Sequence, residues 1–141
     1  MASEHRDYSS TPLAKKLGIR ERSRVLVAGA PDGFDLGPLP TGVRRLARAG
    51  RGMDVVLLFV TERTGLRRRL ESLARGLDPA GRLWVAWPKR TSTVASDLDF
   101  ATVQRTGLEL GLVDNKSASL NEDFQGLQFV YRLRDRADVR R

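Results

Sequence analysis

Residues 54–60 read Asp-Val-Val-Leu-Leu-Phe-Val, and this stretch decides the fold of the chain. Its apolar side chains follow one another without alternation, which is typical of a parallel strand that is buried on both faces. Two further apolar runs have the same character, namely Arg24–Gly29 (RVLVAG) and Leu83–Trp87 (LWVAW). These three segments therefore predict the centre of a mostly parallel sheet.

Helical patterns lie between and after these strands. Leucines at positions 66, 70, 73 and 77 form one stripe of a helix. Thr11-Pro12 and Gly18 are the start and stop signals of a short helix. Another helix follows Ser96 and Asp97, with Ser96 and Asp99 as an approximate capping pair, and one of its faces carries Phe100, Val103, Gly107 and Leu110.

Turns and a hairpin complete the expected order. Asp78–Gly81 predicts a turn and residues 31–42 an irregular loop, because these segments are rich in Pro, Gly and Asp. Residues 43–48 suit either a strand or a helical turn, and we favour a strand. Residues 127–133 alternate like a half-exposed strand, expected to pair antiparallel with residues 113–118 across a turn at 121–123.

This order predicts one α/β domain at residues 11–133, with a mostly parallel sheet and a C-terminal antiparallel hairpin. Residues 1–10 are expected to be a flexible tail and residues 134–141 a charged tail that frays. A chain of 141 residues suits a single domain of this kind.

Composition excludes several classes of site. The chain has no cysteine and one histidine, His5, which argues against zinc-thiolate sites, disulfides and a Ser–His–Asp triad. No apolar run approaches the ~20 residues of a membrane helix, and the N-terminus is not a secretory signal. We expect a cytoplasmic protein that binds no metal and no membrane.

The net charge of +8 is concentrated in the middle of the sequence. Residues 40–90 hold twelve cations and four acids, whereas the flanking thirds are nearly neutral. Such asymmetry is a feature of nucleic-acid-binding proteins, and it is equally a feature of a solvated, arginine-rich helix face.

Polar residues follow the apolar strands at the points where each strand is expected to end. Ligands of open α/β sheets bind beyond the carboxyl ends of the strands. Four segments should meet there, and the residues that we expect to line this crevice are Asp32, Gly33, Phe34, Arg63, Trp87, Lys89, Arg90, Asn115 and Lys116. Each has a plainer interpretation as well: Asp32 as a turn residue, Trp87 as the end of a core strand, and Asn115 and Lys116 as loop residues. We predict no catalytic residue.

Residues 18–34 (GIRERSRVLVAGAPDGF) resemble the first strand and loop of the Rossmann-like fold of S-adenosylmethionine (SAM)-dependent methyltransferases. Residues 69–90 resemble the helix, turn and fifth strand of that fold. The fuller pattern STPLAKKLGI, APDGFDLGPLP, AWPKR and GLVDNKS resembles a family of small Rossmann-like proteins, found mainly in actinobacteria, that is catalogued as a domain of unknown function. The second resemblance implies a fold and no activity.

Three functions remain open from the sequence. The first is a non-catalytic Rossmann-like binding or protein-interaction module, with a homodimer or another protein as partner. The second is a minimal SAM-dependent methyltransferase, although residues 43–52 lack the acid that would hold the ribose of the cofactor. The third is a nucleic-acid-binding protein that uses residues 40–90.

Overall fold

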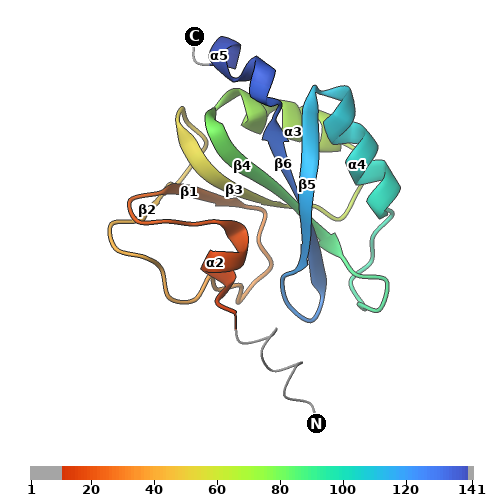
Figure 1. The fold of residues 1–141 in the computed structure, drawn as a ribbon. Coiled ribbons are helices and arrows are strands. Elements are labelled where there is room, and N and C mark those ends of the chain that lie inside the picture. Colours follow the sequence, from red (N-terminus) through yellow and green to blue (C-terminus); the bar gives the residue numbers. More distant parts are fainter. Residues whose placement is uncertain (1–10, 140–141) are drawn as a thin grey trace.

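The computed structural model describes residues 11–139. One six-stranded sheet runs through it in the order β2-β1-β3-β4-β6-β5 (Figure 1). The strands are β1 (Arg24–Ala28), β2 (Arg44–Arg45), β3 (Met53–Phe59), β4 (Leu77–Pro88), β5 (Leu112–Ser119) and β6 (Phe124–Tyr131). The helices are α2 (Leu13–Leu17), α3 (Leu66–Arg75), α4 (Phe100–Glu109), a 3-10 turn at Leu133–Asp135 and α5 (Arg136–Val139).

The sheet has the predicted mixture of strand directions. β1 pairs parallel with β2 and β3, and β3 pairs parallel with β4. β6 is antiparallel to both β4 and β5, so the C-terminal hairpin forms one side of the sheet. The α/β class, the three central strands and the antiparallel hairpin are thus confirmed.

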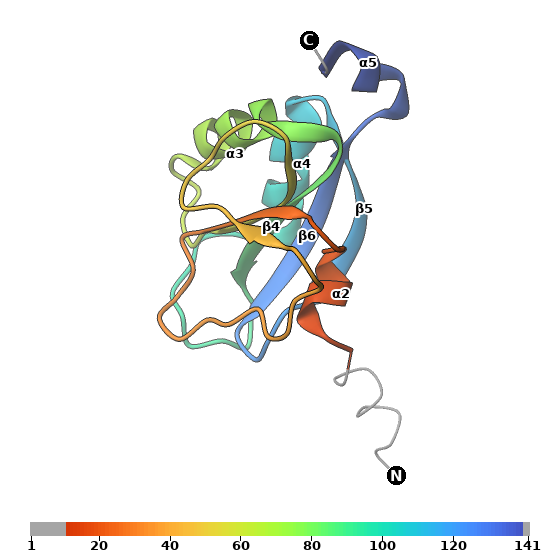
Figure 2. The ribbon, with the colours of Figure 1, turned by 90° about the vertical axis from the view of Figure 1, so that its left-hand side faces the viewer.

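The two faces of the sheet are covered differently (Figure 2). Helices α3 and α4 pack on one face, where Leu70, Val103 and Phe129 belong to the same buried cluster. On the other face lie α2 and the long loop after β1, and Leu17 and Leu36 belong to the buried cluster there. Burial on both faces explains why the central strands are continuously apolar.

Two boundaries differ from the sequence prediction around β4. The leucine stripe of α3 ends at Leu73, and Leu77 is already the first residue of β4. The expected turn at Asp78–Gly81 is an irregularity inside this strand, because the pairing with β3 slips between Leu77 and Arg82. The Asp78 carboxylate accepts a hydrogen bond from the Ala80 amide at 3.0 Å, so the turn chemistry is present but is absorbed within a strand.

The C-terminal half shows three further differences. The prediction of a half-exposed strand was wrong, because β6 is buried on both faces between β4 and β5. Asp99 is the N-cap of α4, and Ser96 instead accepts a hydrogen bond from the Leu98 amide. Residues 134–139, within the stretch 134–141 predicted to be a charged tail, belong to the 3-10 turn and to α5, while the expected tail at residues 1–10 lies outside the described residues.

The segment at residues 43–48 is a strand over two residues alone. β2 comprises Arg44 and Arg45, both exposed, and it pairs with Arg24 and Val25 of β1. The loop at residues 31–42 forms neither helix nor strand, as predicted. The first crossover of the sheet is therefore made by a loop, whereas α3 makes the crossover from β3 to β4.

Candidate functional site

The carboxyl ends of β1, β3 and β4 lie at one edge of the sheet because these strands are parallel. After β1 the chain moves outward to β2, and it then returns to β3 on the other side of β1. The order of the strands therefore reverses between β1 and β3. Open α/β sheets bind their ligands at such a switch point.

A pocket of about 270 Å³ lies at this switch point. Its base is apolar, with Phe59, Val60 and Leu66, and its polar lining residues are Thr61, Glu62, Thr64 and Arg69. Gly29 borders it with a φ of 73°, and a Cβ at this position would lie 2.8 Å from the Phe59 carbonyl oxygen and 3.6 Å from Arg69 Nη2. Glycine is thus required both by the backbone conformation and by the close approach of β3.

The pocket combines one carboxylate with one guanidinium. Glu62 follows β3 in the chain, and Arg69 lies on the first half of α3, which begins directly after that loop. Neither Glu62 nor Arg69 is among the crevice residues predicted from the sequence, and both are exposed. The predicted order of strand and helix could have pointed to Arg69, because the first turns of a helix that follows a parallel strand lie at the carboxyl edge of the sheet.

A second hollow lies beyond the carboxyl end of β4. Two adjoining pockets of about 710 and 590 Å³ share Trp87, Lys89, Arg90 and Phe100. Trp87 is 2% exposed and its ring meets the Phe100 ring edge-on, with centroids 6.3 Å apart. Phe100 is 44% exposed, so this ring forms the accessible apolar surface while Trp87 supports it from within.

The loop after β4 is fixed on two sides. Lys89 donates through its amide to the Asp123 carbonyl at 2.7 Å and through Nζ to Ser119 Oγ at 2.6 Å. The Asp97 carboxylate accepts from the Arg63 amide at 2.8 Å, and the Asp97 amide donates to the Thr61 carbonyl at 3.2 Å. The loops after β3 and β4 are therefore joined into one rim.

Asp99 closes this rim at the start of α4. Its carboxylate accepts a hydrogen bond from the Thr102 amide at 2.8 Å. Hydrogen bonding by Thr102 is the main cause that holds the pKa of Asp99 below its ordinary value, and the charges of Arg63 and Arg105 act in the same direction.

The nine predicted crevice residues divide into three groups. Trp87, Lys89 and Arg90 are brought together in the hollow after β4, and Arg63 belongs to its rim. In the loop after β1, Asp32 and Gly33 are exposed, whereas Phe34 packs its ring 4.8 Å from that of Phe59 and contributes to the core.

Asn115 and Lys116 do not reach this edge. Both lie in the middle of β5 rather than in a loop after it, beside a shift in the pairing with β6. Asn115 accepts a hydrogen bond from the buried side chain of Gln128 at 2.7 Å, and Lys116 donates to the Lys16 carbonyl at 2.9 Å. Their polar character gave the misleading appearance of a loop.

Residues 11–139 contain neither a cluster of metal-ligating side chains nor a membrane-spanning helix. Across this span, no group of three or more His, Cys, Asp or Glu side chains could hold a metal ion. Nor is any helix within it long and apolar enough to cross a membrane.

Comparison with solved structures identifies similar folds. A SAM-dependent methyltransferase from Aquifex aeolicus superimposes with a TM-score of 0.60 at 12% identity, over 92% of this chain and 97% of its own. A TehB-like SAM-dependent methyltransferase from Corynebacterium glutamicum gives 0.53 at 14%, over 93% and 96%. The magnesium protoporphyrin IX methyltransferase of Synechocystis, solved with bound SAH, gives 0.55 at 13%, over 93% and 84%.

These similarities show that the chain has the Rossmann-like fold found in SAM-dependent methyltransferases. No family model and no curated protein matches the chain. The resemblance to the actinobacterial family therefore stays a prediction.

Proposed function

We propose that the protein is a minimal SAM-dependent methyltransferase that holds its cofactor at the switch point between β1 and β3. One observation carries this proposal: the Glu62 carboxylate and the Arg69 guanidinium both line the pocket at the switch point, beside the backbone of Gly29. It lies where ligands of open α/β sheets bind.

The residues of this pocket fit the methionine end of the cofactor. That end carries an ammonium and a carboxylate, so Glu62 and Arg69 supply opposite charges for both groups. A volume of about 270 Å³ suits this end rather than the whole cofactor. The exposed backbone at residues 29–33 would hold the adenosyl part, with no help from a carboxylate at residues 43–52.

When bound, SAM supplies a methyl group on a positively charged sulfur that a nucleophile can attack. The chain's own residues would position the acceptor in the hollow after β4, with Phe100 as an apolar surface and Lys89 and Arg90 as cations. Among the described residues that line this hollow, Asp99 is the one carboxylate, and its lowered pKa makes it a weak base. Catalysis here would depend on positioning, and the acceptor would already be nucleophilic at neutral pH.

Isothermal titration of S-adenosylhomocysteine (SAH) tests the proposal. We expect saturable binding that weakens about tenfold in Glu62→Gln and in Arg69→Gln, since each change removes one charge partner. Arg68→Gln is the matched control, because Arg68 is the exposed neighbour of Arg69 on the same helix. Absence of binding at millimolar SAH would reject the proposal.

A second candidate is the non-catalytic binding or interaction module. The observation that favours it is the sequence of β2, where Arg44 and Arg45 stand in place of an acid. Two results together would support this candidate. Light scattering would show a homodimer or a stable complex with another protein, and titration would show no affinity for SAM or SAH.

A third candidate is nucleic-acid binding through the basic middle of the chain. Arg44, Arg45, Arg67 and Arg68 are all exposed. Phosphate contacts predict an affinity for duplex DNA that falls with salt, with a log–log slope of about −0.9 per phosphate. Binding that is independent of salt would exclude it.

A further inference from the structure

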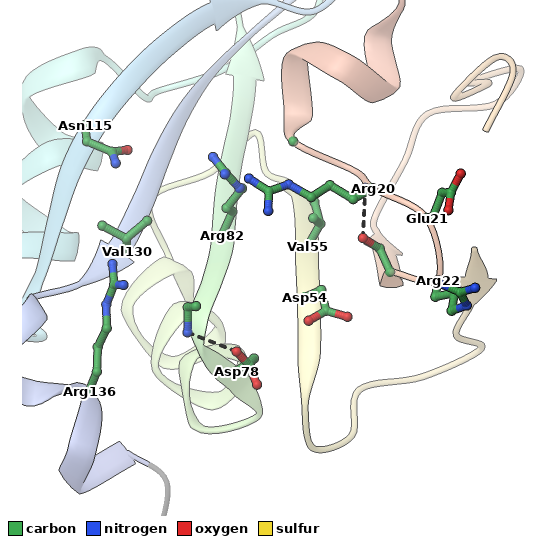
Figure 3. A pocket seen from close by; sticks show the side chains of 13 residues that line it. Arg20, Glu21, Arg22, Asp54, Val55, Asp78, Arg82, Asn115, Val130 and Arg136 are labelled. Atoms are coloured by element: carbon green, nitrogen blue, oxygen red, sulfur yellow. Dashed lines mark hydrogen bonds between the residues drawn. The ribbon is translucent and has the colours of Figure 1, made fainter. Parts of the chain in front are cut away.

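A hollow lined by arginines lies at the opposite edge of the sheet from the switch point. It has a volume of about 470 Å³ and lies among the connection from α2 to β1, the starts of β3 and β4, and α5 (Figure 3). Four arginines line it: Arg20, Arg22, Arg82 and Arg136. Ligands of the methyltransferase fold bind at the carboxyl edge, so this hollow is a separate feature of the chain.

Arg82 is held in place by the structure around it. Its side chain passes over Gly18, where a Cβ would lie 2.5 Å from Arg82 Nε. Arg82 Nη1 donates to Gln128 Oε1 at 3.4 Å, and the Gln128 amide donates to Asn115 Oδ1 at 2.7 Å. Gln128 is 1% exposed, so a buried amide anchors the guanidinium, while Arg82 remains part of the lining of the hollow.

Arg20 and Arg136 approach the same hollow from two other elements. In the view of Figure 3 the Arg20 side chain extends toward Arg82, and Arg136 extends from α5 toward Val130. The Arg20 amide donates to Ser23 Oγ at 2.9 Å, which fixes the connection that carries Arg20. Arg22, by contrast, points away from the hollow in this view.

No ion pair within residues 11–139 joins Arg20, Arg82 or Arg136 to a carboxylate. The ion pairs of this span are Arg67–Glu109, Arg75–Glu71 and Arg134–Asp135. Three carboxylates also line the hollow, namely Glu21, Asp54 and Asp78. Asp54 accepts a hydrogen bond from the Arg24 amide at 2.8 Å, and Asp78 accepts one from the Ala80 amide. With four arginines and three carboxylates in its lining, the hollow carries an excess of positive charge, which would attract an anion.

We propose that this hollow binds a phosphate-bearing anion through Arg20, Arg82 and Arg136. Guanidinium groups match phosphate oxygens with paired hydrogen bonds, and three of them suit a ligand with more than one negative charge. Pyrophosphate and the diphosphate of a nucleotide share this chemistry. The proposal does not depend on the proposed methyltransferase function.

Titration calorimetry of the full chain with pyrophosphate at low ionic strength tests this assignment. We expect saturable binding with one site per chain, and a dissociation constant raised about tenfold in Arg20→Gln. Arg20 is exposed, so this variant should keep its fold, which its thermal midpoint checks. Arg82→Gln should weaken binding at least as much, and Arg68→Gln, on the exposed side of α3, is the control.

These titrations distinguish binding in the hollow from non-specific attraction of an anion to a basic protein. Absence of pyrophosphate binding, or equal weakening in Arg20→Gln and in the Arg68→Gln control, would overturn the proposal. A parallel titration with ADP distinguishes a nucleotide from free pyrophosphate as the ligand. Binding of ADP that is tighter than binding of pyrophosphate assigns a nucleotide, and binding that is no tighter assigns free pyrophosphate. SAH binding should be unchanged in Arg20→Gln, so failure of either proposal is visible without the other.

Discussion

Helix α4 (Phe100–Glu109) lies very close to the sheet at Gly107, in its last turn. A Cβ at this position would lie 2.1 Å from Phe129 Cε1, 2.5 Å from Cζ and 2.6 Å from Cδ1. Contacts between carbon atoms are favourable at about 3.5–4.0 Å, so the ring would have to move by more than an ångström. Phe129 is fully buried, which leaves it no free space.

Gly107→Ala therefore sets two effects against each other. Alanine in place of glycine stabilises a helix interior by about 1 kcal/mol, whereas overpacking a filled core costs about 1–3 kcal/mol. Because three ring atoms are affected, we expect the upper part of that range and a net loss of about 1–2 kcal/mol in the free energy of unfolding. Urea denaturation of the wild type and the variant measures it.

A double-mutant cycle with Phe129→Leu isolates the contact. Removing the ring should leave space for the new methyl group, so Gly107→Ala should be neutral or stabilising in the Phe129→Leu background. Equal destabilisation in both backgrounds, or a Gly107→Ala variant as stable as the wild type, would refute this account of how α4 packs on β6.

Three further perturbations follow from named contacts. Trp84→Phe should cost about 1–3 kcal/mol in urea denaturation, because the buried Trp84 Nε1 donates to the Leu17 carbonyl at 3.1 Å; an unchanged midpoint would contradict a structural role for that bond. Asp99→Ala should destabilise the protein at neutral pH through loss of the α4 cap. Since the pKa of Asp99 is lowered in the folded state, that deficit is full above the ordinary carboxyl pKa and disappears as the pH falls through the lowered value; a deficit that persists in strong acid would exclude the cap as its cause. Gly29→Ala should lower the thermal midpoint because of its positive φ and the 2.8 Å approach to the Phe59 oxygen, and a midpoint equal to the wild type would contradict that reasoning.

The sheet was predictable from the sequence because burial on both faces leaves a simple pattern. The apolar runs at 24–29, 54–60 and 83–87 became β1, β3 and the second half of β4. The prediction of a half-exposed strand at residues 127–133 was wrong. Gln128 suggested an exposed face, yet it is buried because β6 lies between β4 and β5, and its side chain is hydrogen-bonded to Asn115 and Arg82.

The candidate sites were less predictable because they depend on contacts between distant segments. Lys89 and Arg90 were found since they follow a strand directly. Glu62 and Arg69 line one pocket because of the crossover from β3 into α3, and Arg82 packs over Gly18, 64 positions earlier in the chain. The pattern of polar residues along the sequence does not show which separated residues lie next to each other in the fold.

We propose that SAM binds at the switch point between β1 and β3. Amide chemical shifts of the isotopically labelled protein, recorded during titration with SAH, test it most directly. We predict saturable shifts at Gly29, Thr61 and Glu62, with Arg20 and Arg82 unaffected. Absence of shifts at millimolar SAH, or shifts confined to the arginine-lined hollow, would contradict the claim.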